Sequence, residues 1–154
     1  MKENETSGVL LPPPVVYFVF LLAGYWVDKY LPLPFINTNM SFIAGISIIV
    51  LSFILFGVVL LEFSRLKTSV DHRKPTNAII TTGAFRYSRN PIYISMVMLC
   101  IGISFLINSL WGFVATLLAS IIITKFVIIK EETYLERKFG ESYLQYRKAV
   151  RRWL

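Results

Sequence analysis

Long apolar runs, separated by short polar segments, dominate the pattern of this chain. Because about 20 apolar residues of helix cross the roughly 30 Å hydrocarbon core of a bilayer, each run predicts a membrane-spanning helix. Four runs meet or approach this length, over about residues 14–30, 41–63, 91–107 and 110–129. Only Asn108-Ser109 divides the last two runs, so we expect them to form a tight helical hairpin.

The ends of the runs carry residues that begin or end helices. Pro32 and Pro34 end the first run, and Pro91 suits the first turn of the third. We expect Ser41 to cap the second run. Small residues along the second run would allow close contact between helices; these are Gly45, Ser47, Ser52 and Gly57.

Polar segments follow the second and fourth runs. Residues 64–90 predict a loop with one short helix or extended piece. Leu135 and Phe139 stand four apart with charges between them, which predicts an amphipathic helix that continues from the fourth span. Gly140 would end that helix. The aromatic and basic residues of Tyr143–Trp153 fit a short helix at the membrane interface.

Composition agrees with a membrane protein of one domain, residues 1–154. The chain is 55% hydrophobic and its mean hydropathy is +0.61, which is too apolar for a soluble domain of 154 residues. We therefore predict an all-α membrane protein with four transmembrane helices, a C-terminal helical hairpin and a cytoplasmic amphipathic helix. The short length and short loops are typical of a prokaryotic inner (cytoplasmic) membrane protein.

The placement of charge predicts the orientation. Lysine and arginine gather in residues 64–91 and after residue 129, whereas residues 31–40 carry no charge. The positive-inside rule therefore places residues 64–90, residues 130–154 and both termini in the cytoplasm. Basic residues beside spans suit anionic lipid headgroups and do not indicate a nucleic-acid partner.

The chain offers little for metal or disulfide chemistry. Cys100 and His72 are the only residues of their types, which excludes a disulfide within the chain and a Cys/His metal cluster. Cys100, inside an apolar run, is interpreted as core filler. Lys2 and Glu3 precede Pro12 without a cleavage site, so the start of the chain does not resemble a signal peptide. A soluble dinucleotide fold is excluded because its glycine motif is missing.

Candidate chemistry gathers where the third run begins. Arg86 and Arg89 either flank a span with snorkelling side chains or capture an anion, since guanidinium grips carboxylate or phosphate with two parallel bonds. Asn90-Pro91 is either ordinary helix-start chemistry or an anion site built from free N–H groups. Tyr93, on the first turn, is either an interface aromatic or a ligand contact.

A second polar cluster ends the fourth run. Adjacent helical residues point about 100° apart, so one of Glu131 and Glu132 is expected to be a plain surface charge. The other would face the hairpin and could hold an ammonium group. An anion site near Asn90 and a cation site near Glu131 would together suit a zwitterionic amino acid. Lys125, close to the end of the span, either snorkels or faces substrate.

Three blocks of sequence carry a family resemblance. They are Thr81–Tyr93, with its Arg-Asn-Pro-x-Tyr ending, then Glu131-Glu132, then the Phe-Gly-x-x-Tyr-x-x-Tyr block Phe139–Tyr146. In this order and spacing the chain resembles the integral membrane methyltransferases related to isoprenylcysteine carboxyl methyltransferase and the phospholipid N-methyltransferases. The resemblance covers roughly residues 76–150. Asn90 stands where the eukaryotic prenylcysteine enzymes have histidine, and no proline follows Trp153.

The resemblance implies S-adenosylmethionine as the methyl donor, held at the cytoplasmic face. The residues that would line it are Asn77, Ala78, Ile79, Ile80 and Phe85. Those that would contact its amino acid end are Asn90, Pro91, Ile92 and Tyr93, with Glu131 taking the ammonium group. Arg89, Glu132 and Lys125 are the expected catalytic residues. No metal is expected.

The type of methyl acceptor depends on whether the acceptor must lose a proton before it reacts. A carboxylate is already ionised and needs no general base, whereas an amine or thiol must lose a proton to one of few candidates: Glu132, Tyr87, Tyr93 or Lys125. This favours O-methylation of a lipophilic or small acceptor like isoprenylcysteine carboxylate, entering from the bilayer. The alternatives are a phospholipid or amine N-methyltransferase, a sterol-reductase-like NADPH enzyme, and a non-enzymatic membrane scaffold.

Overall fold

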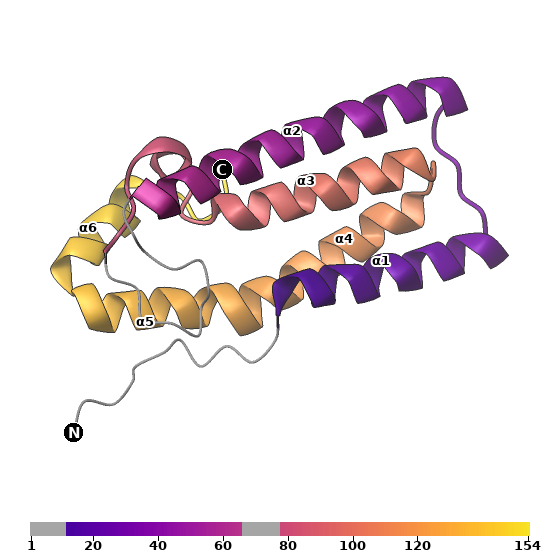
Figure 1. Ribbon diagram of the computed structural model, residues 1–154. Coiled ribbons are helices and arrows are strands. Elements are labelled where there is room, and N and C mark those ends of the chain that lie inside the picture. The colour runs from indigo at the N-terminus through magenta and orange to yellow at the C-terminus, as the bar shows by residue number, and fades with distance from the viewer. Residues whose placement is uncertain (1–11, 66–77) are drawn as a thin grey trace.

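The computed structural model describes residues 12–65 and 78–154, and every regular element in those ranges is helical (Figure 1). In chain order the elements are α1 (Pro13–Tyr30), α2 (Thr38–Arg65), the short 3₁₀ helix η1 (Gly83–Arg86), α3 (Pro91–Leu106), α4 (Leu110–Ile123), the π-helical segment η2 (Thr124–Ile128), α5 (Ile129–Phe139) and α6 (Glu141–Ala149).

The long helices form a bundle of two pairs, with α2 running along α3 and α1 along α4 (Figure 1). The predicted hairpin of α3 and α4 is confirmed, and Asn108 turns it in a left-handed conformation with φ of 49°. This turn lies at the same end as the link between α1 and α2. The opposite end carries η1, α5, α6 and the C-terminal tail, so the candidate residues Arg89, Glu131 and Glu132 lie there.

The outer faces of the bundle are apolar. Large hydrophobic side chains such as Phe18, Ile43 and Leu117 are exposed along the helices. Within the described ranges, two helices are long and apolar enough to cross a membrane, Thr38–Arg65 and the continuous rod Leu110–Phe139, while Pro91–Leu106 is a shorter apolar helix. Surfaces of this kind require a lipid environment, so the chain is a membrane protein, and the described part of it is helical. The number of spans and their orientation stay predictions.

Close packing of α2 on α3 depends on two of the four small residues that the sequence indicated. A Cβ on Gly45 would lie 2.8 Å from Leu106 Cδ2, and the Ser52 hydroxyl donates to the Ser95 carbonyl at 2.8 Å. Ser47 is exposed and bonds within its own helix, and a Cβ on Gly57 would meet open space. The helices thus meet along one face of α2, and Ser47 and Gly57 lie off that face.

The start of α2 differs from the prediction. The helix begins at Thr38 and is capped by Asn37, whose Oδ1 accepts the Asn39 N–H at 2.9 Å. Ser41, the expected cap, lies one turn inside the helix and is buried. Its hydroxyl donates to the carbonyl of Phe105 across the interface with α3.

The helix of the fourth run continues beyond residue 129, as the sequence predicted. Helix α4 passes through the π-helical residues Thr124–Ile128 into α5 without a break. A π turn holds more residues than an α turn, so it rotates the face that α5 presents to the rest of the bundle. Gly140 ends α5 with a φ of 56°, as the sequence predicted, and α6 folds back from it (Figure 1).

Candidate functional site

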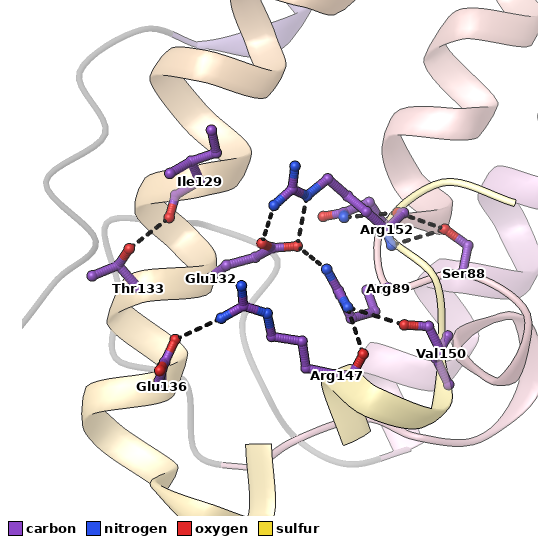
Figure 2. Close-up of polar contacts among 10 residues, drawn as sticks. Ser88, Arg89, Ile129, Glu132, Thr133, Glu136, Arg147, Val150 and Arg152 are labelled. Carbon is purple, nitrogen blue, oxygen red and sulfur yellow. Dashed lines mark hydrogen bonds and ion pairs between the residues drawn. The ribbon is translucent and has the colours of Figure 1, made fainter. Parts of the chain in front are cut away.

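Three charged side chains from distant parts of the chain meet at the polar end of the bundle (Figure 2). Arg89, one residue before the Asn90 that precedes α3, donates through Nη2 to Glu132 Oε1 at 2.7 Å. Arg152, in the C-terminal tail, donates through Nε to Oε1 at 3.1 Å and through Nη2 to Oε2 at 2.8 Å. The two oxygens of Glu132 are thus shared by two guanidinium groups, one of them bound by two parallel bonds.

Arg89 is the centre of this cluster. Its side chain is only 8% exposed, and Nη1 donates to the carbonyls of Arg147 at 2.9 Å and Val150 at 3.0 Å (Figure 2). Its Nε is buried and has no hydrogen-bond partner among the described residues. Arg89 therefore joins α3, α5 and α6 and leaves its Nε–H without an acceptor in the part of the chain that the structure describes.

The cluster holds Glu132 in its charged form. Burial raises the pKa of this carboxyl, but the hydrogen bonds from Arg152 and Arg89 and their positive charges outweigh burial, so the pKa is lowered overall. Glu132 lies in the polar extension beyond the apolar stretch of α4. An ionised carboxylate that is already shared by two arginines is a poor proton acceptor. The contacts of Glu132 therefore argue against a role as general base.

The C-terminal tail is bound to the segment that precedes α3. The Arg89 N–H donates to the Arg151 carbonyl at 2.9 Å, and the Ser88 hydroxyl donates to the Arg152 carbonyl at 3.1 Å. The side chain of Asn90 donates through Nδ2 to the same Arg152 carbonyl at 3.0 Å and makes no capping bond to α3. Asn90 occupies the position before α3, with Pro91 in the first turn, as ordinary helix-start chemistry predicts, but its side chain binds the tail.

Tyr93 and Glu131 form the second contact between α3 and α5. Tyr93 is fully buried on the first turn of α3, and its hydroxyl donates to both carboxylate oxygens of Glu131 at 3.0 Å. Both adjacent glutamates therefore contact neighbouring elements, so the expectation that one is a plain surface charge is wrong. The reason is that their partners approach from two directions, Tyr93 from α3 and Arg152 from the tail.

The predicted donor-lining residues are only partly exposed. Ile80 and Phe85 are buried in the hydrophobic core, and Ala78 and Ile79 are half-buried. Phe85 packs edge-on against Phe63 of α2, with ring centroids 5.7 Å apart. Pro91 and Ile92 are also buried. Asn77, like His72, lies outside the described residues.

Two predicted charges do not join the cluster. Arg86, at the end of η1, and Lys125, in the π-helical segment, are both exposed. Exposure of Lys125 agrees with a snorkelling side chain. Cys100 is buried in the hydrophobic core, in agreement with its interpretation as core filler.

The residues that the sequence analysis missed are Arg152 and Glu62. Arg152 was grouped with the basic residues of an interface helix, and no local pattern distinguishes it from its neighbour Arg151. Glu62 is a buried carboxylate at the end of an apolar helix, where a charge is costly, and that cost was an available signal.

These residues include a donor and an acceptor of the two kinds that would hold a small zwitterion. Arg89 Nε is a buried donor suited to a carboxylate, and Glu131 is an acceptor suited to an ammonium group. Arg89 binds Glu132, the neighbour of Glu131 in sequence, so both groups lie beside the start of α5. The residues present therefore fit the amino acid end of a ligand such as S-adenosylmethionine.

Comparison with known proteins identifies the family of the chain. The sequence model described as Phospholipid methyltransferase matches residues 40–142, so the chain belongs to the phospholipid methyltransferase family. The family membership inferred from the three sequence blocks is confirmed.

Two relatives are named protein-S-isoprenylcysteine O-methyltransferase. The one from Schizosaccharomyces pombe is 38% identical over 92 residues, which cover 58% of this chain and 37% of the relative. The one from Xenopus laevis is 30% identical over 156 residues, which cover 97% of this chain and 54% of the relative. The matched region thus spans about half or less of each of these relatives.

A third relative, an uncharacterised protein from Haemophilus influenzae, is 33% identical over 63 residues, which cover 41% of this chain and 100% of the relative. No solved structure matches the chain.

Proposed function

We propose that this protein is a membrane-embedded methyltransferase that uses S-adenosylmethionine and acts on a lipophilic acceptor. The observation that carries the proposal is a pair of contacts at one end of the helix bundle: Arg89 binds Glu132, and Tyr93 binds the adjacent Glu131. The membership of the chain in the phospholipid methyltransferase family supports it.

The amino acid end of the donor would lie between α3 and α5. Arg89 would offer Nε to its carboxylate, and Glu131, oriented by the Tyr93 hydroxyl, would accept from its ammonium group. When bound, S-adenosylmethionine supplies an electrophilic methyl group on a sulfonium. The role of the chain is to align an acceptor at about 3–3.5 Å from that methyl and to exclude water.

The Arg89–Glu132–Arg152 cluster supports a positioning role over proton transfer. Glu132 is shared by two arginines and has a lowered pKa, so it would hold Arg89 in place instead of removing a proton. Lys125 is exposed and lies outside the cluster, where it could contact only an acceptor that approaches along the outside of the rod Leu110–Phe139.

An acceptor that is already ionised suits this site best. With Glu132 engaged, a carboxylate like that of isoprenylcysteine would react without a general base, so O-methylation is favoured. The relatives from Schizosaccharomyces pombe and Xenopus laevis carry names of that activity. Amine N-methylation is the second candidate because the family description names phospholipids.

We also propose the topology. Four helices, α1 to α4, would cross the membrane, and η1, α5, α6 and both termini would face the cytoplasm. The basic residues at the end of the bundle that carries α5 and α6 support this orientation. The donor would then enter from the cytoplasm and the acceptor sideways from the bilayer.

Transfer of a labelled methyl group tests the function. Purified protein in lipid nanodiscs would be incubated with methyl-labelled S-adenosylmethionine and either a prenylated cysteine with a free carboxylate or phosphatidylethanolamine. Base-labile label in the prenylated cysteine supports O-methylation, because methyl esters hydrolyse in base. Base-stable label in the phospholipid supports the second candidate. Absence of transfer to both, together with absence of donor binding, would overturn the proposal.

A further inference from the structure

Glu62 occupies an unusual position for a carboxylate. It lies in the last turns of α2, at the end of a long apolar helix, and is only 8% exposed. Among the described residues it forms an ion pair with Arg65 at 3.5 Å, and the Arg65 side chain is 73% exposed, so this ion pair contributes little. Burial of a carboxylate is costly unless specific hydrogen bonds offset it, so the contacts that Glu62 does make indicate its purpose.

Those contacts are with the turn that begins η1. The Thr82 hydroxyl donates to Glu62 Oε2 at 2.9 Å. Gly83 has a φ of 56°, and a Cβ built on it would lie 2.5 Å from Glu62 Oε1. Position 83 requires glycine for two reasons. The backbone there has a positive φ, and the Glu62 carboxylate occupies the space that a side chain would fill.

Phe85, two residues after Gly83, contacts both α2 and α6. Phe63, the residue after Glu62, packs edge-on against Phe85, and the Tyr146 hydroxyl of α6 donates to the Phe85 carbonyl at 2.8 Å. Ala78–Ile80 lie just before the turn, and Phe85 lies just after it. Glu62 therefore fixes the position of a segment whose two ends carry the residues that the family resemblance assigns to the methyl donor.

We propose that Glu62 is a positioning residue for the methyl donor, acting through Thr82 and Gly83 without touching the donor itself. The inference rests on the proposed function. The inference goes beyond the proposed function because it names a residue of α2 as a determinant of donor affinity. That residue is far in sequence from Arg89 and Glu131. Its effect should fall on binding of the donor, since Glu62 contacts neither Arg89 nor Glu131 through the bonds described above.

Substitutions at the two ends of the Glu62–Thr82 bond test the inference. Glu62→Ala and Thr82→Val each remove it, and we expect each to raise the dissociation constant and KM for S-adenosylmethionine about tenfold, with kcat within about twofold. Glu62→Gln keeps an amide oxygen for the Thr82 hydroxyl and should stay within about threefold of the parent protein. The double variant Glu62→Ala/Thr82→Val should be no worse than either single variant, because both remove one interaction.

A glycine pair in this chain provides the matched control. Gly83 and Gly140 share a φ of 56°, but a Cβ on Gly140 would meet nothing within 4 Å. Alanine at Gly140 adds conformational strain alone, whereas alanine at Gly83 also displaces Glu62. Gly83→Ala should therefore weaken donor binding more than Gly140→Ala. Thermal unfolding of every variant identifies folding defects, and Glu62→Gln and Thr82→Val keep the test available if Glu62→Ala does not fold.

The outcomes separate the two proposals. If the parent protein binds the donor and transfers methyl but Glu62→Ala and Thr82→Val leave the donor KM unchanged, the role of Glu62 is refuted and the proposed function stands. A fall in kcat with an unchanged donor KM, or Glu62→Gln as weak as Glu62→Ala, refutes that role as well. If the parent protein neither binds the donor nor transfers methyl, both proposals fall.

Discussion

Arg89 and Glu132 stand 43 residues apart in the sequence and meet at 2.7 Å in the structure. The bond joins the segment before α3 to α5, so two elements separated by the whole helical hairpin are fixed relative to each other. Arg152 adds a third element by binding the same carboxylate. The relative positions of Tyr93 and Glu131, one turn or less from these residues, depend on this cluster.

Loss of the Glu132 charge should destabilise the protein far more than loss of a neighbouring surface charge. Glu132→Gln leaves two arginines without their counter-charge, at a cost of about 3–5 kcal/mol for a buried pair. Glu136, one turn along α5, pairs with Arg147 at 2.9 Å, but these side chains are 41% and 43% exposed. Glu136→Gln should therefore cost less than about 1 kcal/mol. Thermal unfolding in detergent micelles measures both; equal losses would contradict this account of the cluster.

Two adjacent arginines in the tail should behave differently. The Arg152 side chain binds Glu132 through two bonds, whereas the Arg151 side chain is exposed and its backbone carbonyl accepts the Arg89 N–H. Arg152→Ala should weaken donor binding about tenfold or more because Glu132 and Arg89 lose their alignment. Arg151→Ala should leave the affinity within about twofold. Equilibrium binding of labelled S-adenosylmethionine distinguishes them, and equal effects would show that the tail contributes only its charge.

Stability should fall at acid pH in a manner that depends on Glu132. Its pKa is lower in the folded protein than the ordinary glutamate value of about 4.3, because Arg152 and Arg89 outweigh burial. The stabilisation is therefore fully present above pH of about 4.3 and is lost as the pH falls through the lower folded value. We expect the unfolding temperature to decline in this range, and to decline less steeply in Glu132→Gln. Identical pH profiles for the two proteins would exclude Glu132 as the titrating group.

Most of the fold was predictable because a helix that crosses a lipid bilayer needs about 20 consecutive apolar residues. Apolar runs bounded by Pro32, Pro91 and Gly140 predicted the long helices and the end of α5 to within a few residues. The π-helical segment Thr124–Ile128 was missed because its residues are as apolar as an α-helical stretch. The start of α2 was misplaced because Asn37 and Ser41 are both good caps, and packing against Phe105 uses the second for another purpose.

Packing between α2 and α3 gives a direct test of which small residues matter. A Cβ on Gly102 would lie 2.6 Å from Ile49 Cγ1 and 3.0 Å from the Gly45 carbonyl, whereas a Cβ on Gly57 would meet nothing within 4 Å. Gly102→Ala should lower stability by about 1–3 kcal/mol through overpacking. Gly57→Ala should be neutral or stabilising by up to about 1 kcal/mol, since alanine favours helix. Thermal unfolding of the two variants decides; similar values would mean that the helices are not in close contact.

The candidate site was predictable in its members and not in its contacts. Arg89, Tyr93 and Glu131 stood out because polar residues next to apolar runs are expensive and few. Which carboxylate faces which arginine depends on the path of the tail after α6, and that path has no local signature. The sequence therefore predicted that Arg89 binds an anionic ligand, whereas three of the contacts of Arg89 are with Glu132 and two backbone carbonyls.

Binding of S-adenosylmethionine to the purified protein tests the central claim most directly. Glu131→Gln and Tyr93→Phe alter the Tyr93–Glu131 contact with little change in shape, and Tyr87→Phe, at an exposed tyrosine, is the matched control. In equilibrium dialysis we predict saturable binding by the parent protein and by Tyr87→Phe, with about tenfold weaker binding by Glu131→Gln and a smaller loss in Tyr93→Phe. A folded parent protein that does not bind the donor, or a Glu131→Gln variant that binds it as tightly as the parent, would contradict the account.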